Sequence, residues 1–184
     1  MSRIAKLILP LLMLGAAGPA SAALTEGAKA PDFRTSGALG GKAFRLHLAE
    51  QLRKGPVVLY FYPKAFTQGC TLEAHAFSEA AKDFRALGAT VVGASADDAE
   101  TLARFSTEAC RSAFPVATAT PAMIDGYDVR LKPGAPMSNR TSYLIAPDGR
   151  ILAVHSAMDW KGHVPAMLDA AKAWRWQQGK AAGE

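Results

Sequence analysis

The sequence predicts an α/β fold in which helices cover both faces of a mixed sheet. The first observation is a continuous run of β-branched and aromatic residues at 57–61, typical of a strand buried on both faces. The second is the helical spacing of the apolar residues that follow, which ends at Gly88, a common helix stop. The third is the order of the later segments: another strand and helix, then a hairpin, then a helix.

The first half of the chain supplies a short strand and the central strand–helix unit. Residues 41–48 alternate between apolar and polar side chains after a Gly-rich turn, which predicts a strand. Apolar residues recur at helical spacing up to Leu87, so we expect a helix over 70–87. The apolar run at 90–95 predicts a second parallel strand, and crossovers between such strands are right-handed.

The second half adds a capped helix, a hairpin and a terminal helix. Asp97 or Asp98 can cap a helix whose apolar stripe has Cys110 beside it near the end. Pro147-Asp148-Gly149 is a turn sequence that predicts a hairpin. The other elements expected are an extended stretch at 114–116, hairpin strands at 142–146 and 150–156, and a helix from about 164 to 177. This order matches a thioredoxin-like fold, in which chemistry gathers where strands end and helices begin.

The first 22 residues have the pattern of a secretory signal peptide. Arg3 and Lys6 precede a short apolar run at 7–17, and small residues at 20–22 suit a signal peptidase. A membrane-spanning helix needs about 20 apolar residues, which is more than this run provides. We therefore expect cleavage after Ala22, a mature domain of residues 23–184 in the periplasm, and no stable membrane insertion.

The composition is that of an ordinary globular domain, with 49% hydrophobic and 20% charged residues. Removal of residues 1–22 takes away two basic and no acidic residues, so the formal charge falls from +5 to +3. Acidic and basic residues alternate along the rest of the chain, which argues against nucleic-acid binding. The four histidines and two cysteines lack the spacing of a zinc site, and we expect no cofactor.

Cys70 lies where the strand at 57–61 gives way to the following helix. Only the thiolate of a cysteine is a good nucleophile, and the unpaired N–H groups of a first helical turn favour it. Thr67 can cap this helix through its hydroxyl or contact a small polar ligand, and Pro63 fixes the backbone and helps to exclude water. Each residue also has a plain structural explanation: Thr67 as a capping residue, Pro63 as a strand terminator and Cys70 as a small buried hydrophobe.

The stretch PKAFTQGC carries the PxxxTxxC pattern of the peroxiredoxins, the AhpC/TSA family. The longer stretch VVLYFYPKAFTQGCTLEAHAF resembles the bacterioferritin comigratory protein, or peroxiredoxin Q, subgroup. The resemblance extends from 27–33 through the hairpin at 142–156. It implies a thiol peroxidase that reduces hydrogen peroxide and organic hydroperoxides without metal or flavin. It further implies re-reduction by a thioredoxin-like protein or another thiol, and a monomer.

The resemblance also assigns roles to individual residues. Cys70 would be the peroxidatic cysteine, which becomes a sulfenic acid, while Thr67 would bind the peroxide and Pro63 would shield the thiolate. The family uses an arginine just before a late strand, and Arg140 is the matching candidate. Glu73 matches a family glutamate that could hold an arginine, or it is a solvated acid in the first helical turn.

Two positions depart from the family pattern. The subgroup often has a resolving cysteine five residues after the peroxidatic one, but His75, expected on the surface, occupies that position, and Gln68 replaces a common proline. Cys110 could resolve Cys70 instead, through an intramolecular disulfide, as in members with a second cysteine in the following helix. Both helices would then have to open locally, because Cα atoms joined by a disulfide lie within about 7 Å. The alternatives are a buried core thiol with an external resolving thiol, or a static structural bridge.

Two other classes of function fit the same fold. A disulfide oxidoreductase usually has Cys-x-x-Cys, but the position three before Cys70 is Thr67. A periplasmic redox sensor could use the scaffold without turnover. Peroxide turnover with a reductant separates these classes, since a sensor stays oxidised and an oxidoreductase ignores peroxide.

Overall fold

The computed structural model describes residues 23–181 of the 184-residue chain. The expected signal peptide at 1–22 lies outside these residues. The elements, in chain order, are β1 Arg34–Leu39, β2 Lys42–His47, α1 Leu48–Leu52, β3 Val57–Phe61, α2 Gln68–Ala86, β4 Thr90–Ser95, α3 Ala99–Glu108, β5 Val116–Thr118, α4 Pro121–Gly126, β6 Thr141–Ile145, β7 Ile151–Ser156, the short 3-10 helix η1 Trp160–Gly162 and α5 His163–Ala181. Within 23–181, no helix is long and apolar enough to cross a membrane.

The strands form one mixed sheet in the order β2-β1-β5-β4-β3-β6-β7. β3 is central: it pairs in parallel with β4 and antiparallel with β6, and all five of its residues are buried. Alternate residues of β3 enter two separate cores, with Val58 and Tyr60 on one face and Val57, Leu59 and Phe61 on the other. The continuous apolar run at 57–61 is thus explained by burial on both sides.

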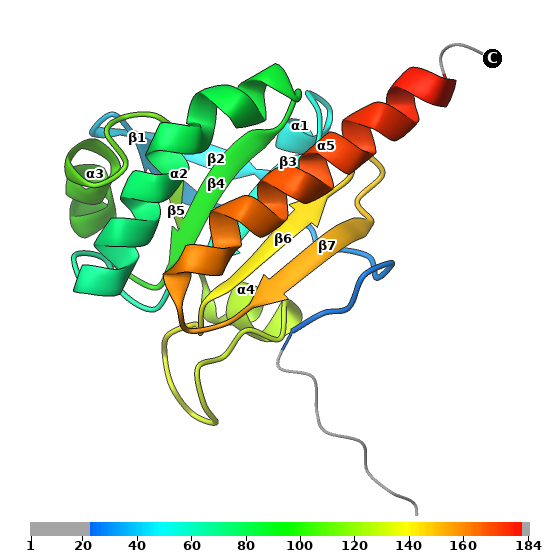
Figure 1. The fold of residues 1–184 in the computed structure, drawn as a ribbon. Helices are drawn as coiled ribbons and strands as arrows, with labels where there is room; N and C mark the ends of the chain where they lie inside the picture. The colour runs from blue at the N-terminus through cyan, green and yellow to red at the C-terminus, as the bar shows by residue number, and fades with distance from the viewer. Residues whose placement is uncertain (1–22, 182–184) are drawn as a thin grey trace, which may run out of the picture.

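Helices cover both faces of the sheet, as the sequence predicts. One core contains apolar side chains of α2, α3 and α5, and the other contains side chains of α1 and α4. Figure 1 shows α2 and α5 side by side across one face, and these two helices are in contact. The end of β3, the start of α2 and the start of α5 thereby come to the same end of the domain (Figure 1).

Several boundaries differ from the sequence predictions. The strands at 57–61 and 90–95 are confirmed, while the helix predicted from residue 70 begins at Gln68 and the final helix is longer at both ends. The extended stretch expected at 114–116 becomes a strand only at Val116. β1 was not predicted, because its sequence, RTSGAL, begins with polar residues and shows no clear apolar alternation.

The two aspartates considered as caps of α3 have different functions. Asp98 is the capping residue, because its carboxylate accepts a hydrogen bond of 2.8 Å from Thr101 N. Asp97 instead accepts from Ala65 N at 2.7 Å and from Ser95 Oγ at 2.8 Å. Asp97 therefore ties the end of β4 to the loop that leads into α2.

Candidate active site

Cys70 lies in the first turn of α2, just beyond the carboxyl end of the central strand β3. Thr67 is the residue before the first helical residue, so Cys70 faces the end of the helix where N–H groups lack partners. The thiol is buried, with 2% of the residue exposed. The predicted junction of strand, helix and thiol is confirmed in position.

Arg140 brings its guanidinium onto the sulfur of Cys70. The residue immediately precedes β6, and its Nη2 donates to Cys70 Sγ at 3.4 Å. Its Nε donates to Met158 O at 3.1 Å, which fixes the plane of the guanidinium. Gly69 allows this approach, because a Cβ at that position would lie 3.2 Å from Arg140 Nη2. Sequence reasoning selected Arg140 but missed Gly69, whose only signal is its place beside the cysteine.

Glu73 is buried one turn after Cys70 and contacts Arg140. Its Oε2 accepts from Arg140 Nη1, and none of the residue is exposed. Of the two interpretations offered for this residue, the solvated first-turn acid is therefore wrong. Burial raises the pKa of Glu73 to about 8, although the charge and the hydrogen bond of Arg140 act to lower it.

Thr67 and Pro63 border the loop between β3 and α2. Of the two roles expected for the Thr67 hydroxyl, the helix cap is not formed, because the hydroxyl donates to Lys64 O at 3.0 Å, and the residue is exposed. With its proton directed there, the oxygen keeps its lone pairs available to a donor from a ligand. Pro63 is half-buried two residues after β3, where it ends the strand.

Cys110 lies just beyond the end of α3 rather than within it. It is fully buried in the same apolar cluster as Cys70, and both cysteines are free thiols. Burial raises the pKa of the Cys110 thiol well above its ordinary value. The next two residues, Arg111 and Ser112, have φ of +50° and +56°, a left-handed backbone that costs non-glycine residues about 1–2 kcal/mol each.

Comparison with known proteins places this geometry in a family. The family model described as AhpC/TSA matches residues 27–154. The chain belongs to the AhpC/TSA family. Peroxiredoxin Bcp of Bacillus subtilis is 30% identical over 151 residues, which cover 79% of this chain and 94% of that protein. A relative from Helicobacter pylori is 45% identical over 82 residues, which make up 45% of this chain and 51% of that protein.

Solved structures agree with this assignment. The crystal structure of peroxidoxin BcpB from Mycobacterium tuberculosis superposes with a TM-score of 0.72 at 32% identity, covering 80% of this chain and 96% of that one. The thioredoxin-like fold is thereby confirmed. The peroxiredoxin relatives indicate a thiol-dependent peroxidase, consistent with an arginine-bound thiol at the start of a helix.

His163 is a further residue of this AhpC/TSA site that sequence reasoning missed. It begins α5 and is fully buried, with Nδ1 2.8 Å from Ser142 Oγ and Nε2 2.9 Å from Ala157 O. Its Nδ1 also lies 3.7 Å from Glu73 Oε1. A histidine at the start of an amphipathic helix gives no sign of this contact, which joins residues 90 positions apart. His75, by contrast, is half-buried on α2.

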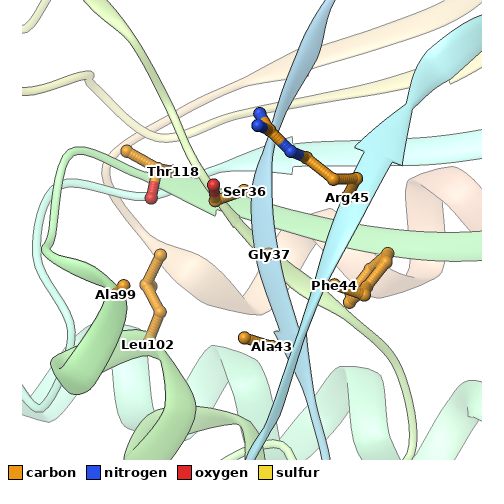
Figure 2. Close-up of a pocket in the computed structure, with 8 residues that line it drawn as sticks. All are labelled: Ser36, Gly37, Ala43, Phe44, Arg45, Ala99, Leu102 and Thr118. Atoms are coloured by element: carbon orange, nitrogen blue, oxygen red, sulfur yellow. The ribbon is translucent and has the colours of Figure 1, made fainter.

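A cavity of about 300 Å³ lies away from the thiol. It is a half-open pocket bordered by the hairpin of β1 and β2, the start of α3 and the end of β5, with Arg45 as the cation among its lining residues (Figure 2). Its other lining residues are small, apolar or hydroxyl-bearing. Across residues 23–181, no group of three or more His, Cys, Asp or Glu side chains could hold a metal ion.

Proposed function

We propose that Cys70 is the peroxidatic cysteine of a peroxidase that reduces hydrogen peroxide and organic hydroperoxides. The observation that carries this proposal is the Arg140 N–H directed at Cys70 Sγ at the start of α2. A guanidinium and a helix N-terminus both favour the thiolate over the thiol. A buried thiol needs no such arrangement if it serves only to fill the core.

The reaction uses these groups in one displacement. The Cys70 thiolate attacks the terminal oxygen of the hydroperoxide, the S–O bond forms and the O–O bond breaks. The sulfur is oxidised to a sulfenic acid, and the leaving oxygen takes a proton and departs as water or an alcohol. Arg140 stabilises the charge that spreads over the sulfur and the two oxygens. Thr67 accepts a hydrogen bond from the peroxide O–H, and Pro63 keeps water from the sulfur.

Cys110 then condenses with the sulfenic acid to give an intramolecular disulfide and water. Support for this step comes from the shared apolar cluster of the two thiols and from the backbone after Cys110. Two consecutive left-handed residues store strain there, so opening of this turn costs less than opening of a relaxed one. A thioredoxin-like protein or a small thiol would reduce the disulfide and restore both thiols.

We infer the cellular location of the enzyme from the sequence pattern of residues 1–22. A signal peptide there supports export to the periplasm, where the reductant would have to act. We expect the enzyme to work as a monomer.

The test follows thiols and intact mass after one equivalent of hydrogen peroxide is added to the purified protein and to Cys110→Ser. A two-cysteine peroxidase loses both thiols and roughly 2 Da, while the variant stops at a Cys70 sulfenic acid. If both proteins stop at the sulfenic acid, Cys110 does not resolve and an external thiol completes the cycle. Absence of any reaction at Cys70 would exclude the peroxidase, and disulfide reduction without peroxide turnover would indicate an oxidoreductase.

A further inference from the structure

The two oxygens of the Glu73 carboxyl have different surroundings. Oε2 accepts from Arg140 Nη1. Oε1 is buried and has no hydrogen-bond partner among residues 23–181. Nδ1 of His163 lies 3.7 Å from it.

The hydrogen bonds of His163 fix which of its nitrogens carries the proton. A backbone carbonyl can only accept, so Nε2, 2.9 Å from Ala157 O, must be the N–H. In the neutral imidazole Nδ1 is then an acceptor, and it accepts a hydrogen bond from the Ser142 hydroxyl at 2.8 Å. Nδ1 therefore has no proton to donate to Glu73 Oε1, which faces an electronegative, unprotonated nitrogen 3.7 Å away.

A carboxylate oxygen and an imidazole lone pair repel one another in a buried site. The repulsion is removed when Oε1 carries a proton, because the carboxyl then has no negative charge. On the carboxyl, this proton leaves Oε2 free to accept from Arg140, because the second oxygen of a protonated carboxyl remains an acceptor. The contact with Arg140 thus needs no negative charge on Glu73.

We propose that His163 is a positioning residue that keeps a proton on Glu73 Oε1, so that Arg140 directs its whole positive charge to Cys70. The inference rests on the proposed peroxidase function. It assigns Glu73 a neutral hydrogen-bonding role in place of the ion pair that its contact with Arg140 would otherwise indicate.

The surrounding charges agree with this assignment. Burial raises the pKa of Glu73 to about 8 and lowers that of His163 to about 4. Between pH 4 and pH 8 the pair therefore holds one titratable proton, and Glu73 carries it. His155 on β7 packs edge-on against the His163 ring at 4.6 Å, and with Arg140 it disfavours an imidazolium. Asp159, before η1, acts in the opposite direction.

The consequence is a loss of peroxidase rate at alkaline pH. Once Glu73 ionises, its carboxylate competes with the Cys70 thiolate for the charge of Arg140. With a Glu73 pKa of about 8, the protonated fraction falls from about nine-tenths at pH 7 to about one-tenth at pH 9. The rate constant for oxidation of Cys70 is expected to fall by up to about tenfold over this range.

The experiment measures this rate constant by stopped flow between pH 6 and 10, with hydrogen peroxide and the full chain. Glu73→Gln should abolish the alkaline fall, because an amide does not titrate. His163→Asn should move the fall to lower pH by about one unit, since an amide N–H can stabilise the Glu73 carboxylate where a lone pair could not. His75→Gln is the matched control on α2, and its profile should follow the parent.

The outcomes separate the two proposals. An alkaline fall that persists in Glu73→Gln, or a profile of His163→Asn that coincides with the parent's, would overturn the role of the pair. If His163→Asn does not fold, the infrared carbonyl band of a buried protonated carboxyl decides. This band should be present in the parent at pH 7 and absent from Glu73→Gln, and its absence from the parent overturns the inference. Failure of Cys70 to react at every pH would instead refute the peroxidase, while the infrared band still tests the proton.

Discussion

Replacement of Arg140 by methionine gives the sharpest test of the proposed chemistry. Methionine keeps an unbranched apolar stem but lacks the guanidinium. The change removes three hydrogen bonds at once: to Cys70 Sγ at 3.4 Å, to Met158 O at 3.1 Å and to Glu73 Oε2. Because only 4% of Arg140 is exposed, water cannot easily replace these donors.

The size of the effect on rate follows from the role of the lost donor. A preorganised donor directed at developing charge is typically worth a factor of about 10²–10³ in rate. We therefore expect Arg140→Met to slow oxidation of Cys70 by hydrogen peroxide about a hundredfold or more. The oxidation rate of Arg140→Lys should lie between those of the parent and Arg140→Met. An ammonium keeps the charge but cannot reproduce the planar fork that reaches three acceptors.

The effect on stability should be smaller than for a broken buried ion pair. Loss of one partner of such a pair costs about 3–5 kcal/mol, because a bare charge is left behind. With a protonated Glu73, and with Cys70 returning to the neutral thiol once the guanidinium is gone, Arg140→Met leaves only neutral acceptors unpaired, and we expect a loss of about 1–3 kcal/mol in the free energy of unfolding. Urea unfolding measures this loss, and stopped-flow fluorescence measures the rate.

Arg45→Met is the matched control, since Arg45 is exposed on β2 and lies away from the thiol. It should oxidise at the rate of the parent. A folded Arg140→Met protein that also oxidised at the parental rate would refute the assignment of Arg140 and leave the helix N-terminus as the source of activation.

Three further predictions concern the turn after Cys110, the buried carboxyl and the residue before the thiol. Ser112→Gly relieves a left-handed backbone, so it should stabilise the protein by about 1 kcal/mol in urea and slow disulfide formation with Cys110, seen as slower loss of the second thiol. Folded Glu73 keeps its proton up to a pKa of about 8, against 4.5 when unfolded, so the stability it contributes is lost as pH rises through 8. Above pH 6.5, the ordinary pKa of an imidazole, unfolded His163 loses its remaining charge and offsets part of this loss, so the unfolding free energy should fall by roughly 1 kcal/mol up to pH 8, and Glu73→Gln should remove this fall. Gly69→Ala places a methyl group 3.2 Å from Arg140 Nη2, so it should lower the rate of Cys70 oxidation severalfold. The control is Gly179→Ala, where a methyl group meets open space and the oxidation rate should equal the parent's.

The elements that sequence reasoning predicted well are those set by local pattern. β3 and β4 are continuous apolar runs between turn signals, and α2 has a long helical period, so each is specified within its own segment. β1 could not be found in this way, because it depends on pairing with β2 and β5 rather than on an apolar pattern of its own. Gly37 in β1 has no side chain to contribute to such a pattern. A Cβ at this position would lie 2.8 Å from Val116 O of the neighbouring strand, so the close pairing requires glycine.

In the site, too, the features set by local sequence could be predicted, and those set by contacts between distant segments could not. The spacing of Pro63, Thr67 and Cys70 is local, and the thiol could be placed at the start of a helix from sequence alone. The direction of the Thr67 hydroxyl could not, since Lys64 O and the helix N–H groups compete for the same side chain. Nor could the state of Glu73, which an exposed helix turn would leave ionised.

What decides the state of Glu73 is the packing of α5 against α2. That contact buries the carboxyl, places the His163 imidazole 3.7 Å from its free oxygen and leaves Arg140 on the other side. The same glutamate would be an anion with water around it and is neutral without it. The local motif therefore supplies the nucleophile, while a helix about 90 residues further along the chain determines how much positive charge that nucleophile meets.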